Sequence, residues 1–156
     1  MRKFEIGDKV FCFIFGKGKV KDVTDNKYII VRFPKPHGPT LYSTSGKFIT
    51  IEGYRKNKTL FFADENPQIK VKKINPRPFE VDDKVYCLMF GEGKVTIVSH
   101  ACGLLAVDFE KRKVLVHGYN TNGTYYTNSN KTLYHLEENP KIITNKFKKR
   151  ENHERL

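Results

Sequence analysis

The chain has 156 residues, and its 29 lysines and arginines against 17 aspartates and glutamates give a formal net charge of +12. Leucine, isoleucine, valine and phenylalanine together supply 44 residues, enough apolar side chains to exclude a disordered chain. No apolar run is long enough to span a membrane, and Glu5 and Asp8 interrupt the segment where a signal peptide would need its apolar core. Three cysteines without a Cys-x-x-Cys pair favour reduced thiols. We therefore expect a folded cytoplasmic protein.

An internal repeat organises the chain. Residues 4–20, FEIGDKVFCFIFGKGKV, match residues 79–95, FEVDDKVYCLMFGEGKV, at 11 of 17 positions, and residues 58–69 match residues 131–142 at 7 of 12. The second copy has four fewer residues between its glycine turn and its KTL motif, which predicts a shorter surface loop there. The predicted organisation is a first copy over residues 1–69, a linker rich in proline and lysine over 70–78, a second copy over 79–142 and a basic tail over 143–156.

Short β-branched or aromatic segments follow one another through each copy, separated by glycine, proline or asparagine. This composition predicts strands at the spacing of small sandwiches and barrels. In the first copy the expected strands are residues 9–14, 19–23, 28–33, 41–44, 48–51 and 59–62. No helix is expected before the tail, so the sequence predicts an all-β fold.

Both faces of the first expected strand are apolar. One face would carry Val10, Cys12 and Ile14, and the other Phe11, Phe13 and Phe15. A strand that is apolar on both sides needs a barrel interior on one side and a further partner on the other. We expect the two copies to pack against each other through these strands, with a bound ligand as the alternative. Cys12 and Cys87 should then occupy matching buried positions.

Glycines 16, 18, 91 and 93 stand between two expected strands, where they predict a tight turn or a bulge. A phosphate-binding loop is the alternative, but neither a helix nor a Lys-Ser/Thr pair follows them.

The run GDKVFCFIFGKGKVKDV, the later VRF strand and the YSTSG turn resemble the SH3-like barrels of the KOW and CarD-type families. The chain is also similar to uncharacterised tandem-repeat proteins of Bacteroidetes phages and prophages, whose pattern reads FxxGDxVYxxxFGxGxV, then VxF, SYTxDG and a Leu-Phe strand. Asp82 departs from the glycine of that pattern, and Lys17 and Glu92 stand where it often has tryptophan. The resemblance implies two tandem SH3-like β-barrels with a short basic tail, and a role at the phage–host interface.

The sequence offers no convincing reactive centre. His100, Cys102 and His117 form the nearest approach to a metal or nucleophile cluster, but only their proximity supports it. The five histidines do not match between the copies, and the paired carboxylates at 82–83 and 137–138 fit a strand entry and a loop. We expect a non-enzyme without a metal or cofactor.

Charge is distributed unevenly between the copies. Residues 1–78 hold 17 basic and 7 acidic residues, residues 79–138 hold 6 and 8, and residues 139–156 hold 6 and 2. A basic face attracts polyanions or acidic protein surfaces, and aromatic side chains beside cations suit single-stranded nucleic acid. The predicted binding residues are Lys17, Lys19, Lys21, Tyr42, Tyr54, Arg55, Lys56 and Lys58, interleaved with Phe13, and Lys146, Lys148, Lys149 and Arg150 in the tail. A lysine-rich surface that only aids solubility is the competing interpretation.

Two function classes follow. The first is a binding protein whose basic copy contacts RNA, DNA or a nucleoprotein complex, and the resemblance to phage proteins implies inhibition of a host nuclease or CRISPR complex. The second is an interaction module that docks on an acidic host protein, or a sponge that holds a nucleotide signal between the barrels.

Overall fold

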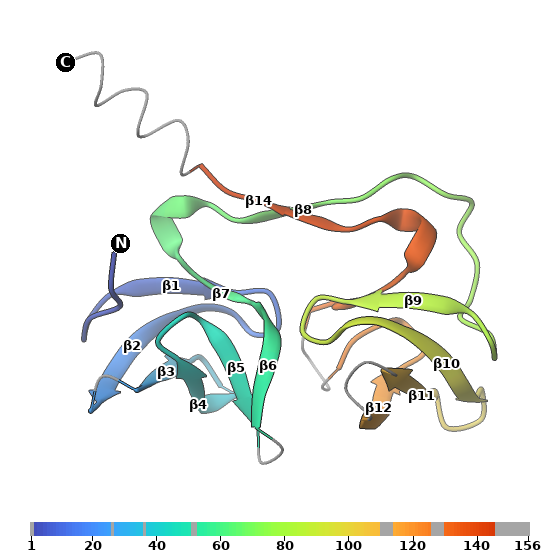
Figure 1. Ribbon diagram of the computed structural model, residues 1–156, viewed down its shortest axis with the longest axis horizontal. Coiled ribbons are helices and arrows are strands. Elements are labelled where there is room, and N and C mark those ends of the chain that lie inside the picture. Colours follow the sequence, from blue (N-terminus) through green and yellow to red (C-terminus); the bar gives the residue numbers. More distant parts are fainter. Residues whose placement is uncertain are drawn as a thin grey trace.

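A computed structural model describes residues 2–25, 27–35, 37–50, 53–109, 114–125 and 130–145 (Figure 1). The strands of the first copy are β1 (Lys9–Cys12), β2 (Gly16–Thr24), β3 (Tyr28–Phe33), β4 (Gly38–Ser43), β5 (Lys47–Thr50), β6 (Gly53–Lys58), β7 (Leu60–Phe62) and β8 (Gln68–Lys70). Those of the second copy are β9 (Lys84–Cys87), β10 (Gly91–Ser99), β11 (Leu104–Phe109), β12 (Val114–Asn120), β13 (Leu133–His135) and β14 (Lys141–Ile143). The described residues also form two single-turn 3-10 helices, η1 (Ala63–Glu65) and η3 (Leu136–Glu138). The all-β prediction is confirmed.

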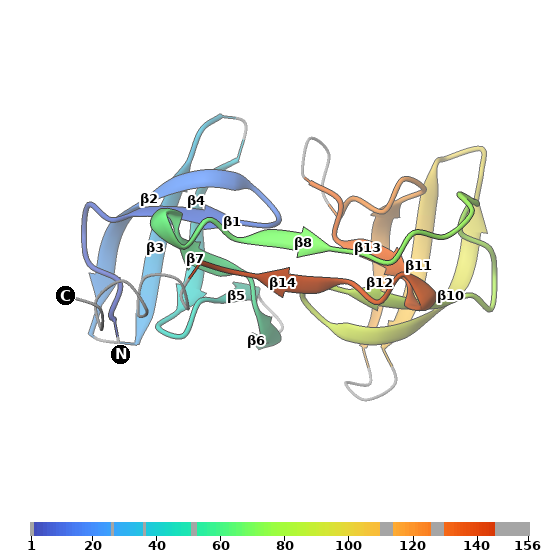
Figure 2. The ribbon, with the colours of Figure 1, turned by 90° about the horizontal axis from the view of Figure 1, so that it is seen from above.

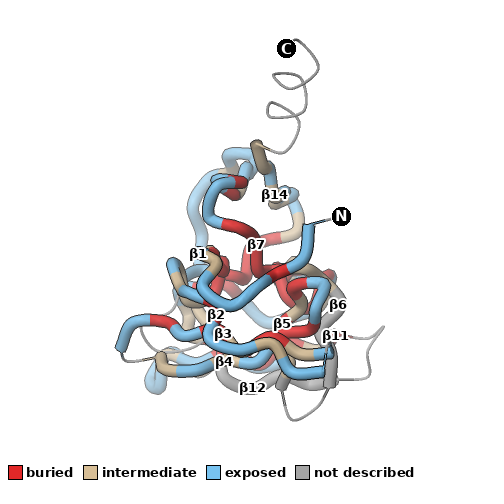
Figure 3. The backbone as a smooth tube through the Cα atoms, turned by 90° about the vertical axis from the view of Figure 1, so that its left-hand side faces the viewer, coloured by how far each residue is buried: buried red, intermediate tan, exposed pale blue. Residues whose placement is uncertain are grey.

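Each copy builds its own antiparallel sheet. The first copy forms a seven-stranded sheet in the order β6-β5-β4-β3-β2-β1-β7, which curls into a nearly closed barrel. The second copy forms a five-stranded half-barrel in the order β12-β11-β10-β9-β13. Figure 3 shows the buried positions of the first copy gathered inside its sheet, with exposed positions along the outside.

The two sheets differ in size because of the segment before the KTL motif. In the first copy this segment forms the paired strands β5 and β6, and Lys47 lies opposite Lys58. In the shorter second copy an isolated bridge joins the corresponding residues, Thr124 and Lys131. The surface-loop position of the length difference stays a prediction, because residues 51–52 and 126–129 lie outside the described residues.

The first strand of each copy places its apolar residues on two sides, as predicted. Val10, Cys12 and Ile14 belong to the main core, whereas Phe11 and Phe13 belong to a second cluster between the copies. Phe15 differs from the prediction, because β1 ends at Cys12 and the following turn brings the Phe15 ring into the main core against Phe33 and Phe48. Alternation applies only while the backbone stays extended.

Cys12 and Cys87 occupy matching buried positions, which confirms that prediction. The hydroxyl of Tyr42 donates a hydrogen bond to Cys12 Sγ at 2.9 Å, and the hydroxyl of Tyr119 donates one to Cys87 Sγ at 2.8 Å. Burial raises the pKa of both thiols, since the charged thiolate is disfavoured away from water.

The copies are joined along a seam with approximate two-fold symmetry. Strand β8 of the first copy pairs with β14 of the second, with Ile69 opposite Ile142, and both strands run side by side between the copies (Figure 2). β8 spans the expected boundary between the first copy and the linker. Beneath it lies the second cluster, made of Phe13, Phe61, Leu88 and Tyr134 with Phe11, Ile69, Tyr86 and Ile142 packed around them.

Backbone hydrogen bonds cross the seam in reciprocal pairs. The amide of Asn57 donates to the carbonyl of Met89 at 3.3 Å, and the amide of Asn130 donates to that of Ile14 at 2.9 Å. The amides of Lys72 and Asn145 donate in the same way to the carbonyls of Glu138 and Glu65, both at 2.7 Å. Corresponding residues of the two copies thus make corresponding contacts, and the copies pack against each other as the sequence predicted.

Thiol labelling tests this arrangement. Cys102 is exposed, whereas Cys12 and Cys87 are buried with raised pKa values, and the thiolate is the reactive form. At mildly alkaline pH, Ellman's reagent should react at once with a single thiol per chain and with three only after denaturation. Mass mapping should assign the fast site to Cys102. Equal native reactivity of Cys12 would show that the core is wrongly described.

Candidate nucleic-acid interface

A row of three cations crosses the outer face of the first copy. Lys9 on β1 lies opposite Lys19 on β2, and Lys19 lies opposite Arg32 on β3. Directly opposed residues of an antiparallel pair project from the same face of the sheet, so these three side chains lie together. All three are exposed, and none forms an ion pair within the part of the chain that the structure describes. Lys9 and Arg32 are members that the sequence analysis missed, because their adjacency depends on strand register.

The predicted lysines of β2 are all exposed, but only two follow a regular alternation. Lys17 lies opposite Phe11, one step along the outer face from Lys19. A β-bulge interrupts the pairing between Val20 and Asp22, with Lys21 inside it. Strict alternation does not apply inside the bulge, so the projection of Lys21 from the side of Lys17 and Lys19 stays a prediction. Beyond it Asp22 is exposed, so a carboxylate borders the basic row.

The second copy has a different charge pattern at the same positions. Lys84 and Lys94 replace Lys9 and Lys19, but Asp108 stands opposite Lys94 where the first copy has Arg32. Lys94 Nζ also lies 3.3 Å from Asp82 Oδ1. One fold thus carries an uncompensated basic row in one copy and a mixed row in the other, so the fold itself does not require the basic row.

The aromatic part of the predicted site is not available. The Tyr42 side chain is fully buried, with its hydroxyl on Cys12, and Phe13 is buried in the cluster between the copies. Neither ring can stack on a base, so the prediction for these two residues is wrong. Both rings are buried because removing their apolar surface from water stabilises the fold.

Lys58 is a packing residue rather than a member of the basic row. Its Nζ lies 4.8 Å from the centroid of Phe61 and 5.8 Å from that of Phe4. Lys131 repeats these contacts in the second copy, at 4.8 Å from Tyr134 and 5.9 Å from Phe79. Since the acidic copy keeps the same lysine, we assign it to cation–π packing.

The remaining predicted residues are not brought into the site by any contact described. Tyr54, Arg55 and Lys56 belong to β6, the edge strand of the seven-stranded sheet, but their side chains lie outside the described part. The tail residues Lys146, Lys148, Lys149 and Arg150 lie outside the described residues altogether.

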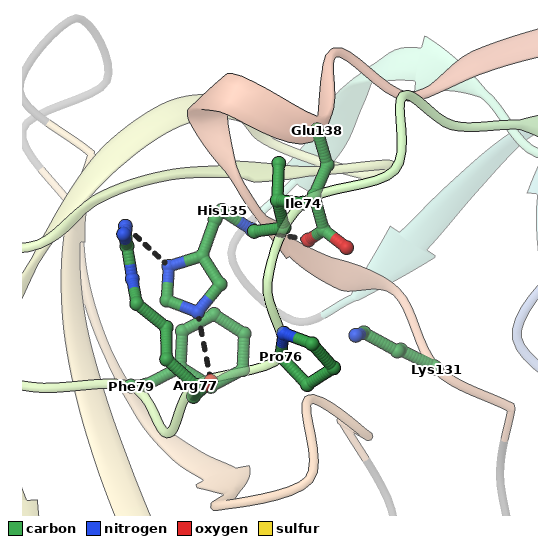
Figure 4. Close-up of a pocket in the computed structure, with 7 residues that line it drawn as sticks. All are labelled: Ile74, Pro76, Arg77, Phe79, Lys131, His135 and Glu138. Carbon is green, nitrogen blue, oxygen red and sulfur yellow. Dashed lines mark hydrogen bonds between the residues drawn. The ribbon is translucent and has the colours of Figure 1, made fainter.

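A polar pocket of about 170 Å³ lies where the linker meets the second copy (Figure 4). His135, buried at 3% exposure, stacks on Phe79 with ring centroids 4.4 Å apart. Its Nε2–H donates to the Arg77 carbonyl at 3.2 Å, and Nδ1 accepts from the Arg77 guanidinium at 3.4 Å and lies 3.8 Å from Asp83. The His135 amide donates to Glu138 at 2.8 Å. Sequence reasoning missed this histidine because it has no counterpart in the first copy.

The first copy shows that this corner is structural. There Phe62 stands in place of His135 and stacks on Phe4 at 4.3 Å, with the Arg2 guanidinium 3.8 Å from its ring centroid. Arg2 pairs with Asp64 at 2.9 Å, as Arg77 pairs with Glu137 in the second copy. His135, Arg77 and Glu138 each have a partner inside the corner, and the arginine clamp persists in the first copy without any histidine. We conclude that the corner fastens each copy to the segment that precedes it.

The other candidate residues, the His100, Cys102 and His117 group and the paired carboxylates, do not form a site within the described residues. Cys102 is exposed, and the side chain of His117 lies outside the described residues. Asp83 accepts a hydrogen bond from the Glu80 amide at 2.9 Å, which explains one member of the paired carboxylates as a turn residue. Within the described ranges no three histidine, cysteine, aspartate or glutamate side chains are grouped as metal ligands. The described residues also contain no helix of the length and apolar character needed to cross a bilayer.

Comparison of the chain with protein-family models, with curated protein sequences and with solved structures found no match.

The repeat suggests a direct test of the His135 corner. His135→Phe installs the residue of the first copy, which keeps the aromatic stack and the arginine clamp, so it should lower the free energy of unfolding by less than His135→Ala does even though the two ring nitrogens are lost. His135→Ala removes the ring from a buried stack and should cost about 3 kcal/mol. Urea titrations measure both. A larger loss for His135→Phe than for His135→Ala would contradict the structural assignment.

Proposed function

We propose that this protein is a non-enzymatic binding protein that docks on a nucleic acid, free or within a nucleoprotein complex, through the outer face of β1, β2 and β3. The observation that carries the proposal is the row of Lys9, Lys19 and Arg32, together with the mixed row at the same positions of the second copy. Because the same fold tolerates either charge pattern, folding does not require the basic row, and such a row attracts polyanions.

The mode of binding is contact with the phosphate backbone. Neighbouring strands lie about 4.8 Å apart, so the row presents cations at short, regular intervals across the sheet. Phosphate contacts of this kind fix position but carry no sequence information. Because Tyr42 and Phe13 are buried, base stacking contributes little at this face. The proposed interaction is therefore strongly dependent on salt and weakly dependent on sequence.

A finer proposal concerns the fold of each copy and the partner of the protein. Each copy would be an SH3-like barrel, complete in the first and reduced in the second, as the resemblance to KOW and CarD-type barrels implies. The similarity to phage tandem-repeat proteins then suggests a host nucleoprotein, such as a nuclease or CRISPR complex in the cytoplasm, as the partner that is inhibited. An acidic protein surface is the competing partner.

Matched double variants test the binding face. Lys9→Glu with Lys19→Glu reverses two charges of the basic row, and Lys84→Glu with Lys94→Glu reverses the same two positions of the second copy. Fluorescence anisotropy with a single-stranded RNA or DNA oligonucleotide should show affinity falling roughly tenfold or more in the first variant. Its slope of log affinity against log salt should flatten by about 1.4, since each lost phosphate contact accounts for about 0.7.

The second-copy variant should change affinity by less than about twofold, since Lys94 is already paired with Asp82. Equal losses in both variants would contradict the asymmetric interface. Absence of binding to any single-stranded or duplex oligonucleotide at physiological salt would overturn the nucleic-acid proposal in favour of an acidic protein partner.

A further inference from the structure

A second candidate site lies at the seam, on elements separate from the basic row. A cavity of about 390 Å³ opens where β14 passes over β9 and the end of β6. We call this cavity the seam pocket. Its lining residues are Asn57, Tyr86, Leu88, Pro140, Lys141 and Ile142. It is of the size that small organic ligands occupy, at the kind of interface between structural units where such sites concentrate.

Differences between the copies explain why there is space here. At the matching place on the first-copy side, Phe13 packs edge-to-face on Phe11 and on Phe61, with centroids 5.3 and 5.7 Å apart. On the second-copy side Leu88 replaces the central ring of Phe13, and Tyr86 replaces Phe11. A smaller side chain at the centre of an otherwise equivalent cluster leaves volume that the cluster does not refill.

The same replacements introduce polar groups. The side-chain amide of Asn57 donates to the Tyr86 hydroxyl at 3.1 Å, and the Asn57 backbone is fixed by its hydrogen bond to Met89. Among the described residues, this arrangement uses one amide hydrogen of Asn57 and leaves its second amide hydrogen and its side-chain carbonyl oxygen for a ligand. A donor and an acceptor thus stand beside the rim of an aromatic ring.

One cation lines the pocket where β14 meets β8, and a second lies next to it on β8. Lys141 lines the pocket and lies directly opposite Lys70, and both are exposed. Like charges directly opposite each other disfavour strand pairing, and a bound anion would relieve the repulsion. The first copy has Gln68 at the position of Lys141, so this charge pair does not follow from the repeat itself.

We propose that the seam pocket binds a nucleoside phosphate. The base lies against Tyr86 and Leu88, its polar edge meets the Asn57 amide, and its phosphate is held by Lys141 and Lys70. An aromatic side chain of a partner protein would fill the apolar space, but it would provide no hydrogen-bond partner for the Asn57 amide and no negative charge for the two lysines. The site is independent of the phosphate-backbone face of the first copy.

Binding to the full chain can be measured by isothermal titration calorimetry and by NMR shift mapping. The probes are the four ribonucleoside 5′-monophosphates, the matching nucleosides and inorganic phosphate. We expect at least one monophosphate to bind, with shifts at Asn57, Tyr86 and Leu88. Its nucleoside should bind more weakly, and phosphate alone should not perturb these residues.

Variants drawn from the first copy test the geometry. Leu88→Phe restores the ring that fills the other side and should weaken binding about tenfold or more, because the base loses its stacking position. Lys141→Gln, an exposed change that preserves folding, should weaken the monophosphate while leaving its nucleoside unchanged. Lys9→Glu with Lys19→Glu should leave binding unaltered, so failure of this site is distinguishable from failure of the basic face.

Lack of binding by all four monophosphates would overturn the proposal. Undiminished binding by Leu88→Phe, or an equal effect of Lys141→Gln on nucleotide and nucleoside, would overturn the placement of the base or of the phosphate.

Discussion

The pairing of β8 with β14 is the constraint on which the rest of the structure depends. Each copy sends its last strand out of its own sheet to meet the equivalent strand of the other copy, so that Ile69 and Ile142 face each other near the pseudo-two-fold axis. Two strands of three residues would be marginal alone. They are held because both isoleucines pack on the cluster beneath and because reciprocal backbone bonds close the seam at both ends.

The seam determines which residues remain available for function. Phe11 and Phe13 give the first strand a second apolar face, and the other copy covers that face. Aromatic rings that would otherwise have been exposed beside the lysines are thereby used for packing. The outer surfaces of the two copies differ in charge. The two sides of the seam differ because Leu88 stands in the second copy where the first copy has Phe13. Both proposed binding sites arise at points where the approximate symmetry is broken.

Much of this architecture could be predicted because it is local or repeated. The repeat, the strand composition and the apolar alternation from Val10 to Ile14 are properties of short segments. The remainder depends on partners distant in sequence. β6 (GYRKNK) and β8 (QIK) lack apolar alternation and form strands through pairing. Tyr42 was predicted at the surface because aromatic rings beside cations suit base stacking, whereas its ring is buried and its hydroxyl donates to Cys12 Sγ in the core. The row of Lys9, Lys19 and Arg32 appears only once the register is known.

The central claim, that the seam makes the two copies one cooperative unit, can be tested by a urea titration followed residue by residue with NMR. Amide signals from β2 and β3 and from β10 and β11 should lose native intensity at the same urea concentration. Ile69→Ala, which touches only the seam, should lower both midpoints equally. Loss of one copy's signals while those of the other persist, or a shift confined to one copy, would contradict the account.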